Sequence, residues 1–127
     1  MPLVRLDAPA AEPDLLIGLG DAVHDALVTA IGIPPDDRFQ VLSGSGSTRV
    51  SYDPQYLGIA RDEGFVLVHV FLRGGRSDEL KRAFYRTLAD NVAALGVEPR
   101  NLMVVLTENT VADWSFGEGV AQYLEAR

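Results

Sequence analysis

Apolar side chains recur with helical spacing over residues 12–31, and this pattern predicts an amphipathic helix. Pro13 suits the first turn, where a missing N–H costs nothing, and Gly32 ends the helix. Gly18 and Gly20 weaken the prediction, because a glycine inside a helix costs about 1 kcal/mol relative to alanine. The apolar stripe consists of Leu15, Leu16, Leu19, Val23, Ala26, Leu27, Ala30 and Ile31.

The same pattern returns over residues 77–95 and predicts a second helix. Ser77 is a favourable N-cap, and Asp78 and Glu79 complement the positive end of the helix dipole. Gly96 ends this helix as Gly32 ends the first. The start and the end of the second helix each lie 64 residues after the start and the end of the first. The apolar stripe here consists of Leu80, Ala83, Phe84, Leu88, Val92 and Leu95.

Short apolar runs flank both predicted helices, again 64 residues apart, so the chain consists of two copies of a strand–helix–strand unit. Each copy is expected to form a right-handed β-α-β unit with parallel strands. This predicts an α/β (α+β) fold in which two helices cover one face of a four-stranded, mostly parallel sheet. The apolar runs are residues 3–6, 39–42, 67–70 and 103–106.

We expect one domain over residues 1–127. Its middle carries a Ser-Gly repeat at 43–47, which predicts a flexible hairpin tip with a short return strand at 49–52. A phosphate-binding loop is not indicated, because no lysine stands behind these glycines and no strand–loop–helix pattern surrounds them. The predicted parts are repeat 1 (2–43), hairpin and turn (44–60), repeat 2 (64–108) and a C-terminal segment (109–127).

Residues 65–72 and 102–106 are apolar almost without alternation. Strands of this kind require cover on both faces of the sheet. Since two helices can cover only one face, we expect the other face to pack against further copies of the chain. The sequence therefore predicts an obligate oligomer.

Composition narrows the range of functions. A net charge of −7 argues against a nucleic-acid partner, because phosphate binding needs clustered lysine and arginine. The chain has no cysteine, which excludes disulfides, thiolate metal sites and cysteine nucleophiles. Its two histidines, His24 and His69, fall on different elements and predict no metal site. Without an apolar run long enough for a membrane helix or a signal peptide, the expected location is cytoplasmic, with no membrane partner.

Pro2 follows Met1 directly and begins the first predicted strand. Removal of Met1 would leave a secondary amine at the N-terminus, able to act as a base or to attack a carbonyl group. A strand starting at once would hold this terminus in the core, although termini usually fray. The alternative is a proline with no role beyond an ordinary N-terminal strand.

Three charged residues are candidates to work with that amine. Arg73 and Arg76 follow a strand and precede a helix, at the strand end where parallel α/β units bind ligands. Two guanidinium groups there would bind a carboxylate, or would be solvated loop arginines. Asp37 enters a strand behind a proline pair, and a nearby carboxylate would favour the cationic amine or orient a water molecule. Its alternative is an ordinary turn residue.

Two aromatic residues near the C-terminus, Trp114 and Phe116, could wall a pocket against water or pack in an interface. His24 lies among the apolar positions of the first helix and is expected to be a helix-flank or interface residue. His69, in a central strand, is expected to be packed.

Taken together, these segments resemble the tautomerase superfamily, with the fold of 4-oxalocrotonate tautomerase, and in particular its malonate semialdehyde decarboxylase branch. The resemblance covers residues 2 to about 123. It rests on the order and spacing of Met1-Pro2-Leu3, Ala22-Val23-His24-Asp25-Ala26-Leu27, Pro34-Pro35-Asp36-Asp37-Arg38-Phe39-Gln40, Arg73-Gly74-Gly75-Arg76-Ser77 and Thr107-Glu108-Asn109 through Trp114-Ser115-Phe116-Gly117.

The resemblance implies a homotrimer without cofactor or metal, acting on a small carbonyl substrate that bears a carboxylate. It implies that Pro2 is the catalytic proline, that Asp37 is the active-site aspartate and that Arg73 and Arg76 bind substrate. Trp114 and Phe116 would form the aromatic wall. The best-known decarboxylases have one residue between the arginines and this chain has two, which leaves the direction of Arg73 open.

Several activities remain compatible with these residues. A neutral Pro2 would support keto–enol tautomerisation, and a cationic Pro2 would support decarboxylation, with hydration as a side activity. Water activated by Asp37 would support cofactor-independent dehalogenation of haloacrylates. A further alternative is a binding or sensing oligomer that keeps the scaffold without the chemistry.

Overall fold

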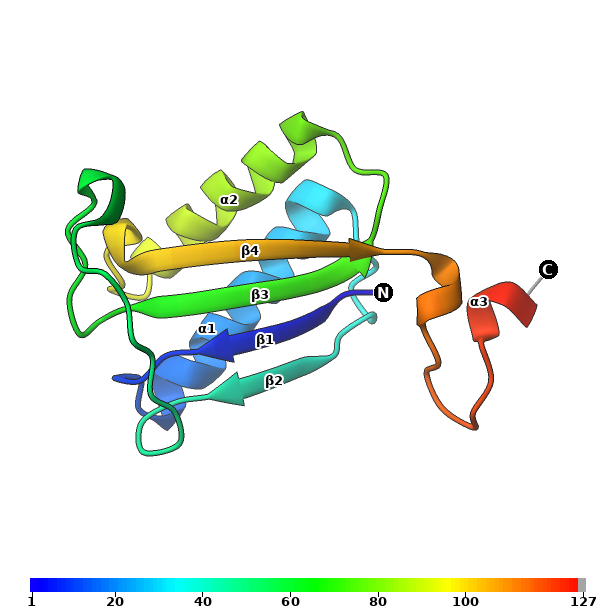
Figure 1. Cartoon of the computed structure of the whole chain (residues 1–127), viewed down its shortest axis with the longest axis horizontal. Coiled ribbons are helices and arrows are strands. Elements are labelled where there is room, and N and C mark those ends of the chain that lie inside the picture. Colours follow the sequence, from blue (N-terminus) through cyan, green and yellow to red (C-terminus); the bar gives the residue numbers. More distant parts are fainter. Residues whose placement is uncertain (126–127) are drawn as a thin grey trace.

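A four-stranded sheet of order β2-β1-β3-β4 organises the chain (Figure 1). The computed structural model describes residues 1–125, so the end of the predicted C-terminal segment, Ala126 and Arg127, lies outside the described residues. The strands are β1 (Leu3–Asp7), β2 (Gln40–Ser43), β3 (Val66–Arg73) and β4 (Leu102–Asn109).

Strand directions confirm the predicted parallel pairs and add a central antiparallel pair. β1 pairs with β2 and β3 pairs with β4 in parallel, while β1 and β3 run antiparallel with Leu3 opposite Phe71. The sheet is therefore mixed, and the start of β1 lies beside the end of β3. This placement brings the N-terminus to the edge where β3 and β4 end.

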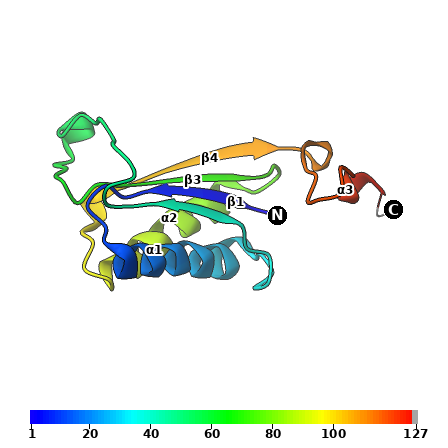
Figure 2. The same ribbon diagram turned by 90° about the horizontal axis from the view of Figure 1, so that it is seen from below.

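Both predicted helices form and lie on one face of the sheet (Figure 2). α1 (Pro13–Ala26) continues into a π-helical stretch, Leu27–Ile31, that the periodicity did not predict. α2 (Asp78–Ala93) is capped as expected, with the backbone N–H of Leu80 donating to Ser77 Oγ at 3.2 Å. The short helices are Tyr56–Gly58, Pro99–Asn101, Val111–Asp113 and α3 (Gln122–Glu125).

The hydrophobic core lies between the sheet and these two helices. Alternate residues of β1 and β3 face the helices, and each large apolar side chain buried there stabilises the fold by roughly 1.5–3 kcal/mol. Among the described residues, neither α1 nor α2 covers the opposite face, and the loop after β2 with its short helix Tyr56–Gly58 lies over only one end of it (Figure 2). The most deeply buried core side chains include Val4, Leu6, Leu19, Val23, Val68, Val70, Phe84 and Leu88.

The predicted return strand at 49–52 is wrong, because this stretch pairs with no strand. Side chains hold the connection instead. The Tyr52 ring stacks on Phe65 with ring centroids 4.7 Å apart, and the Arg61 guanidinium donates to the carbonyl oxygens of Tyr56 and Ile59 at 3.0 and 3.1 Å. The chain therefore leaves β2 as an irregular loop and not as the short hairpin that we expected.

Within residues 1–125, no helix combines the length and the apolar character that crossing a membrane requires.

The two glycines of α1 have different surroundings and give a matched test of the packing between α1 and β2. A Cβ at Gly20 would lie 2.7 Å from Gln40 Oε1 and 2.9 Å from Leu42 Cδ1, whereas one at Gly18 would meet only Leu95 at 3.5 Å. We expect Gly18→Ala to raise the free energy of unfolding by up to about 1 kcal/mol through helix propensity. Gly20→Ala should lower it by about 1–3 kcal/mol through overpacking, and urea denaturation of both variants measures the difference.

Candidate active site

The N-terminal amine lies beside the carboxylate of Asp37, with which the Met1 amino group forms an ion pair. Pro2 is fully buried, and Met1 as a whole is only 8% exposed. The terminus is therefore held inside the protein. Removing Met1 would expose the Pro2 nitrogen and clear the space that the Met1 side chain fills.

Asp37 is positioned by a turn that α1 anchors. The backbone N–H of Asp37 donates to the carbonyl of Pro34 at 3.0 Å, and Nε2 of His24 lies 2.8 Å from the carbonyl oxygen of Pro35. His24 is buried, so it is neither exposed on the helix flank nor free to act at a distance. Its ring fixes the turn that delivers the Asp37 carboxylate.

Arg73 and Arg76 surround the same amine with positive charge. Burial, and after it repulsion from Arg76 and from Arg73, together lower the pKa of the Met1 amine from 8.0 to about 6. The carboxylate of Asp37 acts in the opposite direction, because it stabilises the protonated amine. Four groups from three distant segments of the chain thus interact at one end of the sheet.

The turn between the arginines depends on its glycines. Gly75 adopts a φ of 108°, which side chains other than glycine rarely tolerate, and the backbone N–H of Gly74 donates to the carbonyl of Asn109 at 2.8 Å. The chain folds back so that the Arg76 guanidinium donates to the carbonyl of Arg73. Burial and the charge of Arg73 lower the pKa of Arg76, while Glu108 raises it. Arg76 is half-buried and Arg73 is exposed.

An aromatic cavity of about 430 Å³ opens beside Leu3, the residue that follows Pro2. Trp114 and Phe116 line it in a stacked pair, with ring centroids 5.5 Å apart and an interplanar angle of 6°. The indole N–H of Trp114 donates to Asn109 Oδ1 at 2.7 Å, which fixes the plane of the ring. Phe39 packs on Phe116, with ring centroids 5.9 Å apart. The cavity adds an apolar surface beside the cationic end of the site.

Two contributors to this cavity were not singled out from the sequence. Phe39 reads in the sequence as the start of a strand, and nothing local assigns a role to Asn109. The motif that contains Asn109 was the available signal, but its contact with Trp114 depends on how the chain turns after β4.

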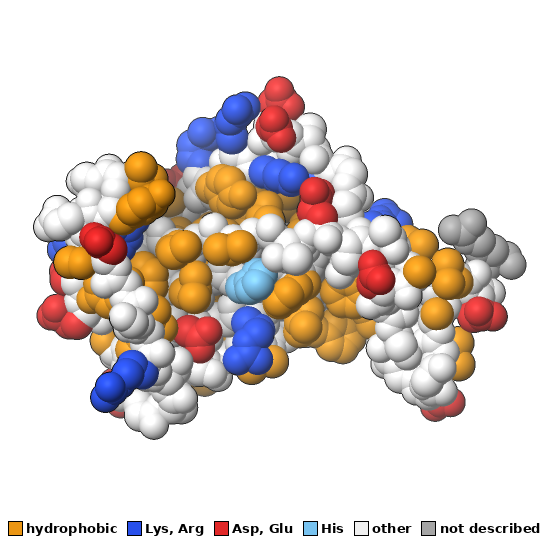
Figure 3. Space-filling model, in the orientation of Figure 1, with side chains coloured by type: hydrophobic (Ala, Val, Ile, Leu, Met, Phe, Trp, Pro, Cys, Tyr) orange, Lys and Arg blue, Asp and Glu red, His pale blue; other side chains and the backbone are white. Residues whose placement is uncertain are grey.

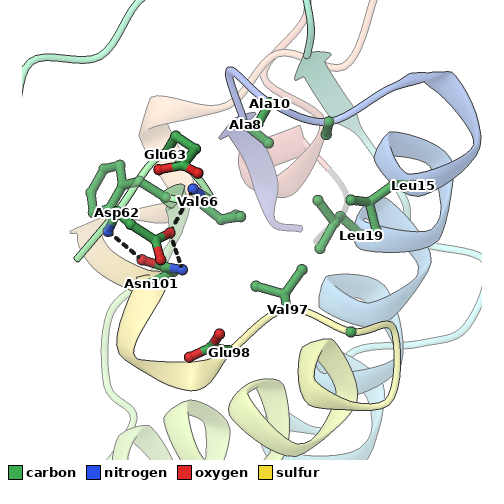
Figure 4. A pocket seen from close by; sticks show the side chains of 14 residues that line it. Ala8, Ala10, Leu15, Leu19, Asp62, Glu63, Val66, Val97, Glu98 and Asn101 are labelled. Atoms are coloured by element: carbon green, nitrogen blue, oxygen red, sulfur yellow. Dashed lines mark hydrogen bonds between the residues drawn. The ribbon is translucent and has the colours of Figure 1, made fainter. Parts of the chain in front are cut away.

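A second cavity, of about 260 Å³, lies at the opposite end of the sheet (Figure 4). The 64-residue repeat places Val66 where Pro2 stands in the first copy, and Asn101 where Asp37 stands. Asn101 is 4% exposed and bonds Asp62 twice, through Asp62 N–H at 3.0 Å and Asp62 Oδ1 at 2.9 Å. This end therefore has an internal peptide nitrogen and a closed amide–carboxylate pair in place of a free amine and its partner.

No described arginine lines the second cavity, and Arg100 beside it is paired with the lining residues Asp62 and Glu98. The counterparts of Arg73 and Arg76 under the same shift are Pro9 and Glu12. The chemistry is thus concentrated at the end that carries the N-terminus. In the part of the chain that the structure describes, no group of three or more His, Asp or Glu side chains is arranged to hold a metal ion.

The chain is similar to known proteins over most of its length. A family model described as "Tautomerase enzyme" matches residues 37–117. The probable tautomerase YusQ of Bacillus subtilis (strain 168) is 33% identical, over 98% of this chain and 100% of its own. The solved structure of FG41 malonate semialdehyde decarboxylase inhibited by 3-bromopropiolate is 36% identical with a TM-score of 0.88, covering 98% of this chain and 95% of that one. A fused 4-OT solved as a symmetric trimer is 28% identical with a TM-score of 0.76, covering 98% and 99%.

The opposing charges around the amine predict opposite shifts in its pKa. Arg76→Leu should raise the amine pKa from about 6 toward its ordinary 8.0, because a repelling cation is removed. Asp37→Asn should lower it, because the carboxylate that stabilises the protonated amine is removed. An NMR titration of protein labelled with ¹⁵N at methionine and proline reports the terminal nitrogen in either processing state. Shifts of the same sign in both variants would contradict this arrangement.

Proposed function

The chain belongs to the tautomerase family, in the branch of malonate semialdehyde decarboxylase, and from this membership we propose that it acts on small carbonyl acids through an N-terminal proline. The observation that carries the proposal is the buried amine, which Asp37 contacts and on which both Arg73 and Arg76 act. Without Met1, the nitrogen at this place is that of Pro2.

The substrate carboxylate pairs with Arg76, assisted by Arg73. Arginine suits this role because its planar fork matches the two oxygen atoms of a carboxylate. The half-buried Arg76 makes the stronger contact, since a shielded charge is screened less by water and salt. The apolar remainder of the substrate lies toward Trp114 and Phe116, which keep water from the reacting carbon atoms.

The protonation state of Pro2 selects the reaction. As a neutral amine, it removes a proton from one atom of the substrate and returns it to another, which is keto–enol tautomerisation. As a cation, it donates a hydrogen bond to the carbonyl oxygen of a β-keto or β-aldehyde acid. The bond to the carboxylate carbon then breaks and carbon dioxide leaves, while the electron pair of that bond forms the carbon–carbon double bond and Pro2 transfers its proton to the carbonyl oxygen, which gives the enol. Protonation of the enol at carbon, with return of the oxygen proton to Pro2, gives the aldehyde or ketone. Addition of water to an unsaturated carbonyl acid, polarised by Pro2 in the same way, would be the hydratase side reaction.

The two directions of pKa shift bear on this choice. Burial and the arginines favour the neutral amine, and Asp37 favours the cation. A terminal amine has an ordinary pKa of about 7.7–8.0, so modest changes in these groups move it across neutral pH. One scaffold can therefore support both tautomerase and decarboxylase activity.

Replacing the proline tests the catalytic proposal directly. Pro2→Ala still permits removal of Met1 but turns the secondary amine into a primary one of different basicity and geometry. We expect kcat/KM for phenylenolpyruvate and for malonate semialdehyde to fall by about 10²–10⁴, in the range of a lost acid or base. In the unmodified enzyme, 3-bromopropiolate should add once, at Pro2, as intact-mass and peptide analysis will show. Unchanged turnover of both substrates in Pro2→Ala would refute the proposal.

A second candidate function follows from the Met1 side chain. Because Met1 is buried in the site, a protein that retains it has the Met1 amine at Asp37 and an amide nitrogen at Pro2. Such a protein would be a binding or sensing oligomer and not an enzyme of this kind. Intact-mass measurement of purified native protein decides between the two, since retained Met1 favours sensing and loss of Met1 favours catalysis.

We also propose that the protein is a homotrimer that covers the open sheet face. Hydrophobic side chains spread over this face, opposite the helices (Figure 3). Val41, Met103 and Val105 are 42%, 45% and 37% exposed there, and contiguous exposed apolar surface marks interfaces. The similar fused 4-OT, solved as a symmetric trimer, supports three copies.

A charge placed on this face should prevent assembly. Val105→Glu lies in the middle of the apolar face, where burying a carboxylate without a partner costs several kcal/mol. We expect light scattering after size exclusion to show a mass near that of one chain. Ile17→Glu, at a 60% exposed position on α1, is the matched control and should keep the mass of the unmodified protein. An unaltered mass in Val105→Glu would mean that this face is not the interface.

A further inference from the structure

A carboxylate lies close to the proposed substrate arginine, and no role has yet been found for it. Glu108, near the end of β4, pairs in register with the buried Leu72, so its side chain is on the helix side of the sheet. It lies against the arginine turn, with Oε2 3.7 Å from the position that a Cβ at Gly74 would take. Its charge reaches Arg76, whose pKa it raises.

Such a carboxylate competes with substrate. A guanidinium binds a protein carboxylate in the same way as a substrate carboxylate, and a neighbouring side chain has a high effective concentration. Glu108 nevertheless forms its ion pair with another residue. Lys81 Nζ lies 3.2 Å from Glu108 Oε1, while Arg76 donates to the carbonyl of Arg73.

Lys81 is well placed to hold Glu108. It lies in the first turn of α2, where its backbone N–H donates to the carbonyl of Ser77 at 3.1 Å. The cap at Ser77 fixes that turn beside the end of β4. The side chains of Lys81 and Glu108 are 25% and 37% exposed, so the pair is partly shielded from solvent and stronger than a fully exposed one.

We propose that Lys81 is a positioning residue that holds Glu108 away from Arg76 and so leaves Arg76 free for the substrate carboxylate. The Lys81–Glu108 pair thereby sets the affinity of the site for carboxylate-bearing substrates. This inference rests on the proposed function in one respect, namely that Arg76 binds the substrate carboxylate. It requires no assumption about the reaction that follows.

Binding of malonate, a dicarboxylate that needs no turnover, tests the inference. Trp114 is the single tryptophan of the chain and lines the neighbouring cavity, so its fluorescence reports binding in protein freed of Met1. In Lys81→Met, the released Glu108 should occupy Arg76 and raise the Kd for malonate about three- to fivefold, the effect of one partly shielded ion pair. Glu108→Gln should bind malonate as tightly as the unmodified protein or more tightly.

The double variant distinguishes positioning from simple loss of positive charge. If Lys81 acts through Glu108, then Lys81→Met has no effect in the Glu108→Gln background, and the double variant binds like Glu108→Gln alone. If Lys81 attracts malonate directly, Lys81→Met weakens binding by the same factor in both backgrounds, and the inference is overturned. Arg82→Met removes an equal charge from the next, exposed position of α2 and should leave the Kd unchanged. Equal effects of Lys81→Met and Arg82→Met would also overturn it.

Two further measurements separate this inference from the proposed function. Arg76→Leu should abolish malonate binding; if binding persists unchanged, the carboxylate site itself is wrong and the inference is overturned with it. Turnover of malonate semialdehyde is measured in the same samples. If the Kd values for malonate in the single and double variants follow the expected pattern in a protein that does not turn over malonate semialdehyde, that result supports the positioning role of Lys81 and refutes the enzymatic proposal. Thermal unfolding midpoints equal to that of the unmodified protein exclude a loss of fold as the cause of weaker binding.

Discussion

The site depends on one pairing, the antiparallel register between β1 and β3. With Leu3 opposite Phe71, the beginning of the chain lies beside the carboxyl end of β3, and the parallel pairing of β3 with β4 brings Asn109 to the same edge. The terminal amine, the two arginines and the aromatic segment meet there for this reason alone. Because a shift of one residue would turn every β1 side chain to the other face of the sheet, the buried Val4 and Leu6 fix the register. Hydrophobic packing in the core thus determines where the polar groups meet.

The charge distribution at this edge is unlike that of the whole protein. The chain carries a net charge of −7, yet the buried amine is surrounded by two arginines and one carboxylate. Locally concentrated positive charge in an acidic protein is a feature of anion recognition and not of general solubility. The carboxylates nearby are each held by a partner. Asp37 contacts the amine and Glu108 contacts Lys81, so neither neutralises the guanidinium of Arg76 by direct pairing.

Much of the fold could be predicted from the sequence because the spacing of apolar residues and the glycines and prolines that end helices are local signals. The apolar stripes of α1 and α2 and the glycines after them fixed the helices to within a few residues, and the 64-residue repeat fixed the strands. The region after β2 could not be predicted in this way. There Arg61 and Tyr52 hold an irregular loop through contacts that have no local pattern. The π-helical turn after α1 was missed for a similar reason, since its apolar residues suit either kind of helix.

Site residues followed the same division. Asp37, Arg73 and Arg76 could be named from the sequence because the arginines lie at the strand end where parallel α/β units bind ligands and because the resemblance gives all three a role. Phe39 resembled an ordinary strand residue, and Glu108 resembled the end of one. Phe39 matters because it packs on Phe116, far away in the sequence. Glu108 matters because Lys81 pairs with it from the helix turn that Ser77 caps. Only the folded structure brings these residues together.

The duplicated architecture repeats the scaffold but not the N-terminal amine. Two copies of a scaffold provide two cavities, but a single polypeptide has only one beginning. At the second cavity, the counterpart of the Pro2 nitrogen is the backbone nitrogen of Val66, which belongs to a peptide bond. Its lone pair is delocalised into the carbonyl, so it cannot act as a base whatever surrounds it. An aspartate or arginines at that place would have no basic amine to act on. The side chains there bind one another instead: Asn101 bonds Asp62 twice, Arg100 pairs with the same carboxylate, and the place that corresponds to the amine's partner holds the loop together.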